Sequence, residues 1–118
     1  MSKISTNKEA AAKFMESLKA DGKKDSTVYR YNMDLELVVG FFGPDNEIGK
    51  VMPARVGLFL KSPALLEMKS GKPKSKATID RTIRVMRQFF DYCVSEGIID
   101  KSPMPKQKEQ PAKTEQAA

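Results

Sequence analysis

A basic segment stands out between Lys69 and Arg87. Its only acid is Asp80, and its basic residues are Lys69, Lys72, Lys74, Lys76, Arg81, Arg84 and Arg87. Such a segment favours the binding of phosphate groups, because a helix start adds free backbone amides and a positive dipole to the basic side chains. A basic loop can equally be a solvated surface without a partner. Charge alone leaves both interpretations open.

A second pattern repeats at two expected helix starts. Thr27-Val28-Tyr29-Arg30 and Thr78-Ile79-Asp80-Arg81 each consist of a threonine, a β-branched residue, a variable residue and an arginine. At helical spacing the β-branched residue points into the core, while the threonine and the arginine project from the first turn. Two such helix starts side by side would present hydroxyls, guanidinium groups and free amides to one polyanion.

The composition excludes several kinds of catalytic site. The chain of 118 residues has no histidine and one cysteine, Cys93. It can therefore build neither a Ser-His-Asp or Cys-His catalytic set nor a zinc site of histidine and cysteine ligands. We expect Asp34, Glu36, Asp80 and Asp91 to lie on solvated faces, away from any pocket of paired carboxylates. The sequence thus predicts no catalytic residue, no metal site and no cofactor.

The remaining composition indicates a small, soluble, basic module. The net charge is +6, and 40% of the residues are hydrophobic. The longest apolar run, from Leu37 to Phe42, is too short to span a membrane. The residues from Met1 to Ser5 lack the apolar stretch of a signal peptide. A single cysteine forms no disulfide within the chain, which fits a reducing compartment. We expect a cytoplasmic protein with no membrane partner.

The first half of the chain predicts two helices. A capping box, Thr6-Asn7-Lys8-Glu9, precedes apolar residues at helical spacing, and Gly22 closes that helix. A second helix is expected to start near Asp25-Ser26-Thr27, where a side-chain oxygen caps the free amides. Its apolar face consists of Val28, Tyr31, Leu35, Val38, Val39 and Phe42, while Arg30, Asp34 and Glu36 face elsewhere. A turn at Gly43-Pro44-Asp45-Asn46 ends it.

The second half predicts a short helix and a long one. Pro53 begins the short helix, which ends near Ser62-Pro63. Residues 62–75 are ambiguous, with a helical turn over residues 64–68 and an exposed, mobile basic loop over residues 69–74 as the expectation. Ser75 caps the long helix of residues 76–96, which Gly97 ends. Its apolar stripe consists of Ile79, Ile83, Met86, Phe90 and Cys93, widened by Val85, Phe89 and Tyr92.

These elements predict an all-α fold, a bundle of about four helices. We expect a disordered N-terminus over residues 1–5, a helical domain over residues 6–103, and a disordered tail or linker over residues 104–118. Cys93 is interpreted as a buried small hydrophobe. Arg81, Arg84 and Gln88 are expected opposite the apolar stripe, so replacing Arg81 and Arg84 with glutamate should leave the fold nearly intact.

The order of these segments resembles the core-binding domain of phage integrases, the tyrosine recombinases. The resemblance is carried by Thr78-Ile79-Asp80-Arg81, then Met86-Arg87-Gln88-Phe89-Phe90, then Gly97-Ile98 and the closing Pro103. Earlier segments fit the same order, so the likeness spans residues 13–103. The chain departs from the family at Ser102-Pro103, where Asn-Pro is common, and in its long loop from Pro63 to Pro73. The catalytic domain of the family is absent.

The resemblance implies a SAM-like, orthogonal helical bundle that forms half of a clamp on duplex DNA during integration. The other half would be a C-terminal catalytic domain of the same full-length chain, and the full-length protein would assemble as a homo-tetramer on DNA. The residues carried over as DNA contacts are Ser26, Thr27, Arg30, Lys76, Thr78, Arg81 and Arg84, and Arg87 lies further along the same helix. Lys72 and Lys74 are added on their charge. Tyr29, Tyr31 and Tyr92 are not expected to be nucleophiles, and Tyr31 and Tyr92 are interpreted as core residues with accessible hydroxyls.

A helical protein-interaction module is the alternative. Its basic loop would meet an acidic protein surface, and its exposed methionines and phenylalanines would meet an apolar groove. Salt-dependent binding to duplex DNA separates the two interpretations.

Overall fold

The structure is a computed structural model, and it describes residues 5–68 and 70–104. The expectations for residues 1–4, for Lys69 and for residues 105–118 lie outside the described residues. Within the described part the chain is all helical and contains no β-strand, which confirms the predicted class. None of the described helices is long and apolar enough to cross a lipid bilayer.

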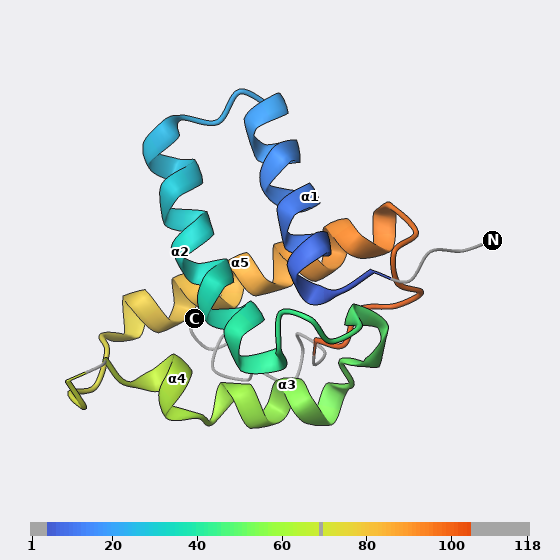
Figure 1. The fold of residues 1–118 in the computed structure, drawn as a ribbon. Coiled ribbons are helices and arrows are strands. Elements are labelled where there is room, and N and C mark those ends of the chain that lie inside the picture. The colour runs from blue at the N-terminus through green and yellow to red at the C-terminus, as the bar shows by residue number, and fades with distance from the viewer. Residues whose placement is uncertain (1–4, 69, 105–118) are drawn as a thin grey trace, which may run out of the picture.

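Five α-helices and one 3-10 turn make up the described chain. They are α1 (Asn7–Ala20), α2 (Asp25–Phe42), the 3-10 turn η1 (Ile48–Lys50), α3 (Pro53–Leu60), the single-turn α4 (Pro63–Leu66) and α5 (Lys76–Ser95). Figure 1 shows α1 and α2 as an antiparallel pair that crosses α5, with α3 and α4 on the other side of α5. The ambiguous residues after Ser62 therefore begin with the helical turn that the sequence allowed.

The ends of α1 and α5 follow the predicted local signals. The hydroxyl of Thr6 accepts the amide of Glu9, and the Glu9 carboxylate accepts the amide of Thr6, both at 3.1 Å. Gly22 and Gly97 have φ angles of 82° and 75°, a conformation that glycine adopts without strain and that reverses the chain after each helix. These residues confirm the predicted capping box of α1 and the predicted glycine after each of the two helices.

The start of α2 differs from the prediction. Its N-cap is Lys24, and no side-chain hydrogen bond caps the helix there. Asp25 is the first residue within the helix, so Ser26 and Thr27 lie inside the first turn. Asp25 still acts on this end of the helix, because a carboxylate in the first turn interacts favourably with the helix dipole.

Aromatic rings from four helices fill the core. Phe14 of α1 lies edge-on to Phe89 of α5, with ring centroids 5.8 Å apart. Phe42 of α2 lies 5.8 Å from Phe59 of α3 and 6.4 Å from Phe90 of α5. The buried stripe of α5 is centred on Thr82, Val85, Met86, Phe89, Phe90 and Cys93, and Ile79 and Ile83 lie at its edges. The packed core thereby fixes α2 across α5, the crossing at which the candidate site lies.

Candidate nucleic-acid interface

A side-chain cap organises the first turn of α5. The hydroxyl of Ser75 accepts the amide of Thr78 at 3.2 Å and donates to the Thr78 hydroxyl at 3.0 Å. These contacts confirm Ser75 as the N-cap. Because Thr78 accepts the Ser75 proton, its own hydroxyl proton is free to be donated to an acceptor outside the protein. The first turn thus offers a fixed hydroxyl next to the free amides of a helix N-terminus.

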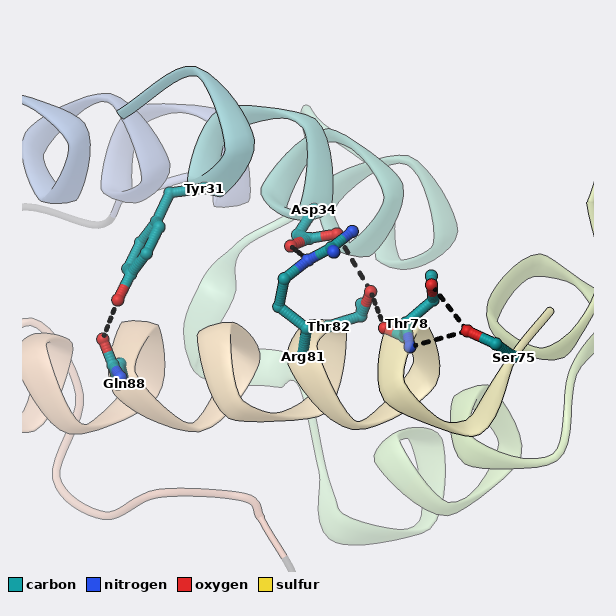
Figure 2. Close-up of polar contacts among 7 residues, drawn as sticks. All are labelled: Tyr31, Asp34, Ser75, Thr78, Arg81, Thr82 and Gln88. Carbon is teal, nitrogen blue, oxygen red and sulfur yellow. Dashed lines mark hydrogen bonds and ion pairs between the residues drawn. The ribbon is translucent and has the colours of Figure 1, made fainter. Parts of the chain in front are cut away.

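The Asp34 carboxylate occupies the crossing of α2 and α5. The Arg81 Nε donates to Asp34 Oδ2 at 3.2 Å, and the Thr82 hydroxyl donates to Asp34 Oδ1 at 2.9 Å. Figure 2 shows both contacts, with the arginine and the threonine coming from one turn of α5. The Asp34 side chain is only 8% exposed, whereas that of Arg81 is 34% exposed. The expectation that Asp34 lies on a solvated face is therefore wrong.

The sequence contains a signal for this buried acid that our interpretation missed. Tyr31 and Val38 lie three residues before and four residues after Asp34, and both belong to the apolar face of α2. Asp34 consequently occupies an inward position of that face. Thr82 occupies an equivalent position in α5, four residues before Met86. A polar residue at a core-facing position needs a hydrogen-bond partner, and each residue supplies the partner of the other.

Arg81 is both a predicted DNA contact and a member of an internal ion pair. It was predicted to point away from the core as a DNA contact, yet its Nε is used in an internal ion pair. The ion pair changes the expectation for glutamate at this position, because a second carboxylate would face the buried Asp34. The terminal nitrogens of Arg81 are the part of the guanidinium that remains for a ligand.

Two further arginines lie next to this ion pair by helical spacing. Arg30 precedes Asp34 by four residues on α2, and Arg84 follows Arg81 by three residues on α5, so each lies one turn away on the same side of its helix. Both are exposed. Within residues 5–68 and 70–104, neither takes part in an ion pair. The crossing of α2 and α5 therefore carries two solvent-facing guanidinium groups beside a partly buried third one.

The two helix starts do not lie side by side. Figure 1 shows α2 beginning next to the end of α1, while α5 begins beside α4. Ser26, which is exposed, and Thr27, which is half-buried, belong to the first turn of α2, whereas Thr78 belongs to the first turn of α5. The two Thr and Arg pairs therefore lie at separate helix starts, and their binding to one polyanion stays a prediction. Helix α2 approaches α5 through its middle, because the apolar residues that hold the two helices together lie there.

Backbone hydrogen bonds hold Lys72 and Lys74, the two described lysines directly before α5. The amide of Met68 donates to the carbonyl of Lys72 at 2.8 Å, and the amide of Lys74 donates to the carbonyl of Leu66 at 2.9 Å. Lys72 is exposed, whereas Lys74 is half-buried with its Nζ 3.5 Å from the Ala64 carbonyl. Lys74 is thus bound to α4 through Leu66 and Ala64, while Lys72 is exposed as expected.

Lys76 and Arg87 complete the predicted set. The Nζ of Lys76 lies 3.1 Å from Asp80, with both side chains largely in solvent. A pair that is this exposed contributes little and is screened by salt, so Lys76 can still approach a phosphate. Arg87 is half-buried on α5. The predicted residues of α5 therefore extend along one helix instead of clustering at its first turn.

Gln88 is a further polar group at the crossing. The Tyr31 hydroxyl donates to its Oε1 at 3.1 Å, as Figure 2 shows. The carbonyl end of Gln88 is therefore engaged, and its amide nitrogen can donate to a ligand. This contact and the hydrogen bond from the Tyr92 hydroxyl to the Lys13 carbonyl agree with the expected core tyrosines with accessible hydroxyls.

The remaining chemically reactive groups have structural surroundings. Cys93 is fully buried, and desolvation raises the pKa of its thiol to about 12. Burial also raises the pKa of Tyr92, with smaller contributions from the neighbouring charges, Glu96 first. Both groups therefore stay protonated at neutral pH. Among the described residues, no three acids or cysteines come together as a potential metal site.

Comparison of the chain with protein-family models, with curated proteins and with solved structures gave no match. The function of the chain is therefore inferred from its residues and from their arrangement in the fold.

Proposed function

We propose that this chain is a DNA-binding domain of the kind that forms the helical half of a tyrosine recombinase clamp. The observation that carries the proposal is the ordered resemblance over residues 13–103, from the helix of Phe14 to the closing Pro103. The fold supports it at three points of that order. Phe89 and Phe90 are core residues, Gly97 has the left-handed conformation that ends α5, and Pro103 is buried.

The finer architecture belongs to the same proposal. A SAM-like core-binding domain is an orthogonal bundle in which the second and the last long helix meet DNA. Here α2 crosses α5 at Asp34, and Arg30 and Arg84 each lie one helical turn from a member of the Asp34–Arg81 ion pair. A duplex lying along this crossing would meet guanidinium groups from both helices, with the Thr78 hydroxyl and the helix N-terminus of α5 at one end.

We further propose that most contacts go to phosphates. The candidate residues are Ser26, Thr27 and Arg30 on α2, Lys72 and Lys74 before α5, and Lys76, Thr78, Arg81, Arg84 and Arg87 on α5. The half-clamp would act with a catalytic domain of the same full-length chain, and the full-length protein would work as a homo-tetramer on DNA. Phosphate contacts position a protein on the duplex but carry little sequence information.

A matched pair of double variants tests the proposed face. Arg30→Gln/Arg84→Gln removes two charges from the crossing of α2 and α5. Lys50→Gln/Arg55→Gln removes the same charge from a hollow beside Asp45 and Glu47. In a fluorescence-anisotropy titration of duplex DNA, the first pair should weaken binding about tenfold or more, since each phosphate contact and its counterion release are lost. Equal losses in the two pairs would mean that only net charge matters and would contradict this face.

The proposal also predicts that the isolated chain forms no covalent link to DNA. A duplex carrying a nick, which traps the tyrosyl-phosphate intermediate of a recombinase, should give no adduct on a denaturing gel. An adduct through Tyr29, Tyr31 or Tyr92 would overturn the assignment of this chain as the non-catalytic half.

One observation favours a protein-interaction module as the second candidate. A groove of about 380 Å³ runs between α1 and α2, and its apolar floor includes Ala11, Ala12, Met15 and Val39. Tyr29 and Met33 are exposed on the same helix pair. Apolar side chains in solvent beside such a groove are typical of a surface that contacts another protein. A chain that binds no duplex DNA at low salt would move this candidate ahead.

A further inference from the structure

The carboxylate of Asp34 is held by two donors from α5. Arg81 Nε donates to Oδ2 and the Thr82 hydroxyl donates to Oδ1, so each oxygen has its own partner. The Thr82 oxygen also lies 3.3 Å from the Thr78 carbonyl, but its single proton is better placed at 2.9 Å from Asp34. A carboxylate that is bound at both oxygens and 8% exposed has a fixed orientation.

The fixed carboxylate in turn fixes the orientation of the Arg81 guanidinium group, because Nε of Arg81 donates to it. A guanidinium is planar and carries five N–H donors, of which one is on Nε and four are on the two terminal nitrogens. The bond from Nε to Asp34 uses the inner edge of the plane. The outer edge, formed by the terminal nitrogens, belongs to a side chain that is one-third exposed. Two parallel donors on such an edge match a pair of neighbouring acceptors.

We propose that Asp34 is a positioning residue that presents the outer edge of Arg81 to two adjacent acceptor atoms of duplex DNA. This inference depends on the proposed function and deepens it. The acceptors are either two oxygens of one phosphate or O6 and N7 of a guanine, because both present the same bidentate chemistry. Arg30 and Arg84 are exposed, and within residues 5–68 and 70–104 neither forms an ion pair with a carboxylate. Arg81 is thus the arginine of this face with a preset direction.

A purely electrostatic role for Asp34 predicts the opposite outcome. If the acid only neutralises part of the basic surface, Asp34→Asn adds one positive charge, tightens DNA binding and steepens its salt dependence. If the acid positions Arg81, the same substitution releases the guanidinium and weakens binding. The sign of the change therefore separates the two roles.

The test is an anisotropy titration of parent, Asp34→Asn, Arg81→Lys and the double variant on one mixed-sequence duplex. Thermal melts establish that each variant is folded at the titration temperature. We expect both single variants to bind about five- to tenfold more weakly, because lysine keeps the charge but lacks the two-pronged edge. The double variant should bind no more weakly than Arg81→Lys. Arg55→Lys on α3 is the conservative control and should bind as the parent does.

A second duplex identifies the source of the acceptors. With every guanine replaced by 7-deazaguanine, N7 is lost and the phosphates are unchanged. If the effect of Arg81→Lys disappears on this duplex, guanine is the acceptor. If the effect of Arg81→Lys persists on this duplex, a phosphate is the acceptor.

The possible failures are distinct. Parent-like or tighter binding by Asp34→Asn overturns the positioning role but leaves the proposed function standing, provided that Arg30→Gln/Arg84→Gln binds weakly. If Asp34→Asn does not fold, Arg81→Lys serves as the test, and parent-like binding by that variant overturns the inference. A parent chain that does not bind duplex DNA removes the inference and the proposed function together.

Discussion

At the scale of single residues, the ion pair between Asp34 and Arg81 links the basic surface of α5 to the core. An exposed arginine contributes mainly charge, whereas an arginine bound to a buried carboxylate also contributes to stability. Removing one member of a buried or half-buried pair leaves the other with an uncompensated charge or an unmet hydrogen bond. The same ion pair therefore has separate consequences for folding and for binding.

Arg81→Glu and Arg84→Glu should accordingly differ in stability. The first places a carboxylate against Asp34 and should lower the free energy of unfolding by about 1 to 3 kcal/mol. The second changes an exposed side chain and should stay within about 0.5 kcal/mol of the parent. Urea denaturation of the two variants checks this difference. Equal midpoints would mean that the ion pair contributes nothing to the fold.

Cys93 gives a prediction about pH. Its pKa is raised to about 12 in the folded chain from a usual value of 9. As pH rises above 9, the thiol ionises in the unfolded chain but not in the folded one, so stability falls between about pH 9 and 12. At pH 8 a thiol reagent should label the folded protein only as fast as it unfolds. Rapid labelling of the native protein would contradict the buried environment.

The sequence predicted the residues that interact within their own turn, but not the residue whose partners are distant in the chain. Thr6, Gly22, Ser75 and Gly97 act within their own turn, and the sequence alone predicted each of them. Asp34 depends on partners 47 and 48 residues away, so its role follows from the crossing of two helices and not from its neighbours. A sequence pattern that identifies an apolar face does not determine which polar residue at that face finds a partner.

At the scale of helices, α5 and α2 differ in how their first turns are capped. Ser75 makes a side-chain hydrogen bond to the backbone of α5, whereas Ser26 lies within α2 and is not its N-cap. Ser75→Ala should therefore cost about 0.5 to 2 kcal/mol of stability. Ser26→Ala is the matched control and should cost less than about 0.5 kcal/mol. Chemical denaturation of both variants measures the difference, and a larger loss for Ser26→Ala would contradict the observed helix start.

Packing across helices gives a second contrast. Phe90 is buried against Phe42 and Phe89, while Tyr29 is 65% exposed on α2. Phe90→Ala should cost about 3 to 5 kcal/mol through lost burial and a cavity. Tyr29→Ala should change stability by less than about 0.5 kcal/mol. Thermal melts test both. At temperatures where Phe90→Ala is folded, it should bind DNA as the parent does, because Phe90 contacts only the core.

The whole molecule combines an aromatic core with a surface of uneven charge. Seven basic residues between Lys69 and Arg87 precede or belong to the helix that α2 crosses. The sequence predicted this charge and the helix that carries it. It did not predict that the starts of α2 and α5 lie apart, because relative helix placement depends on which faces pack together. The candidate surface therefore extends along the α2–α5 crossing instead of surrounding two adjacent helix starts.

The most direct test of DNA binding by this domain is the salt dependence of duplex binding by the parent chain. A half-clamp that contacts about four to six phosphates should give a slope of log K against log salt concentration of roughly −4 to −5. Fluorescence anisotropy between about 50 and 200 mM salt covers the range in which counterion release dominates. A slope in that range supports phosphate binding by this domain. Binding that is absent at low salt, or that does not change with salt, would contradict it.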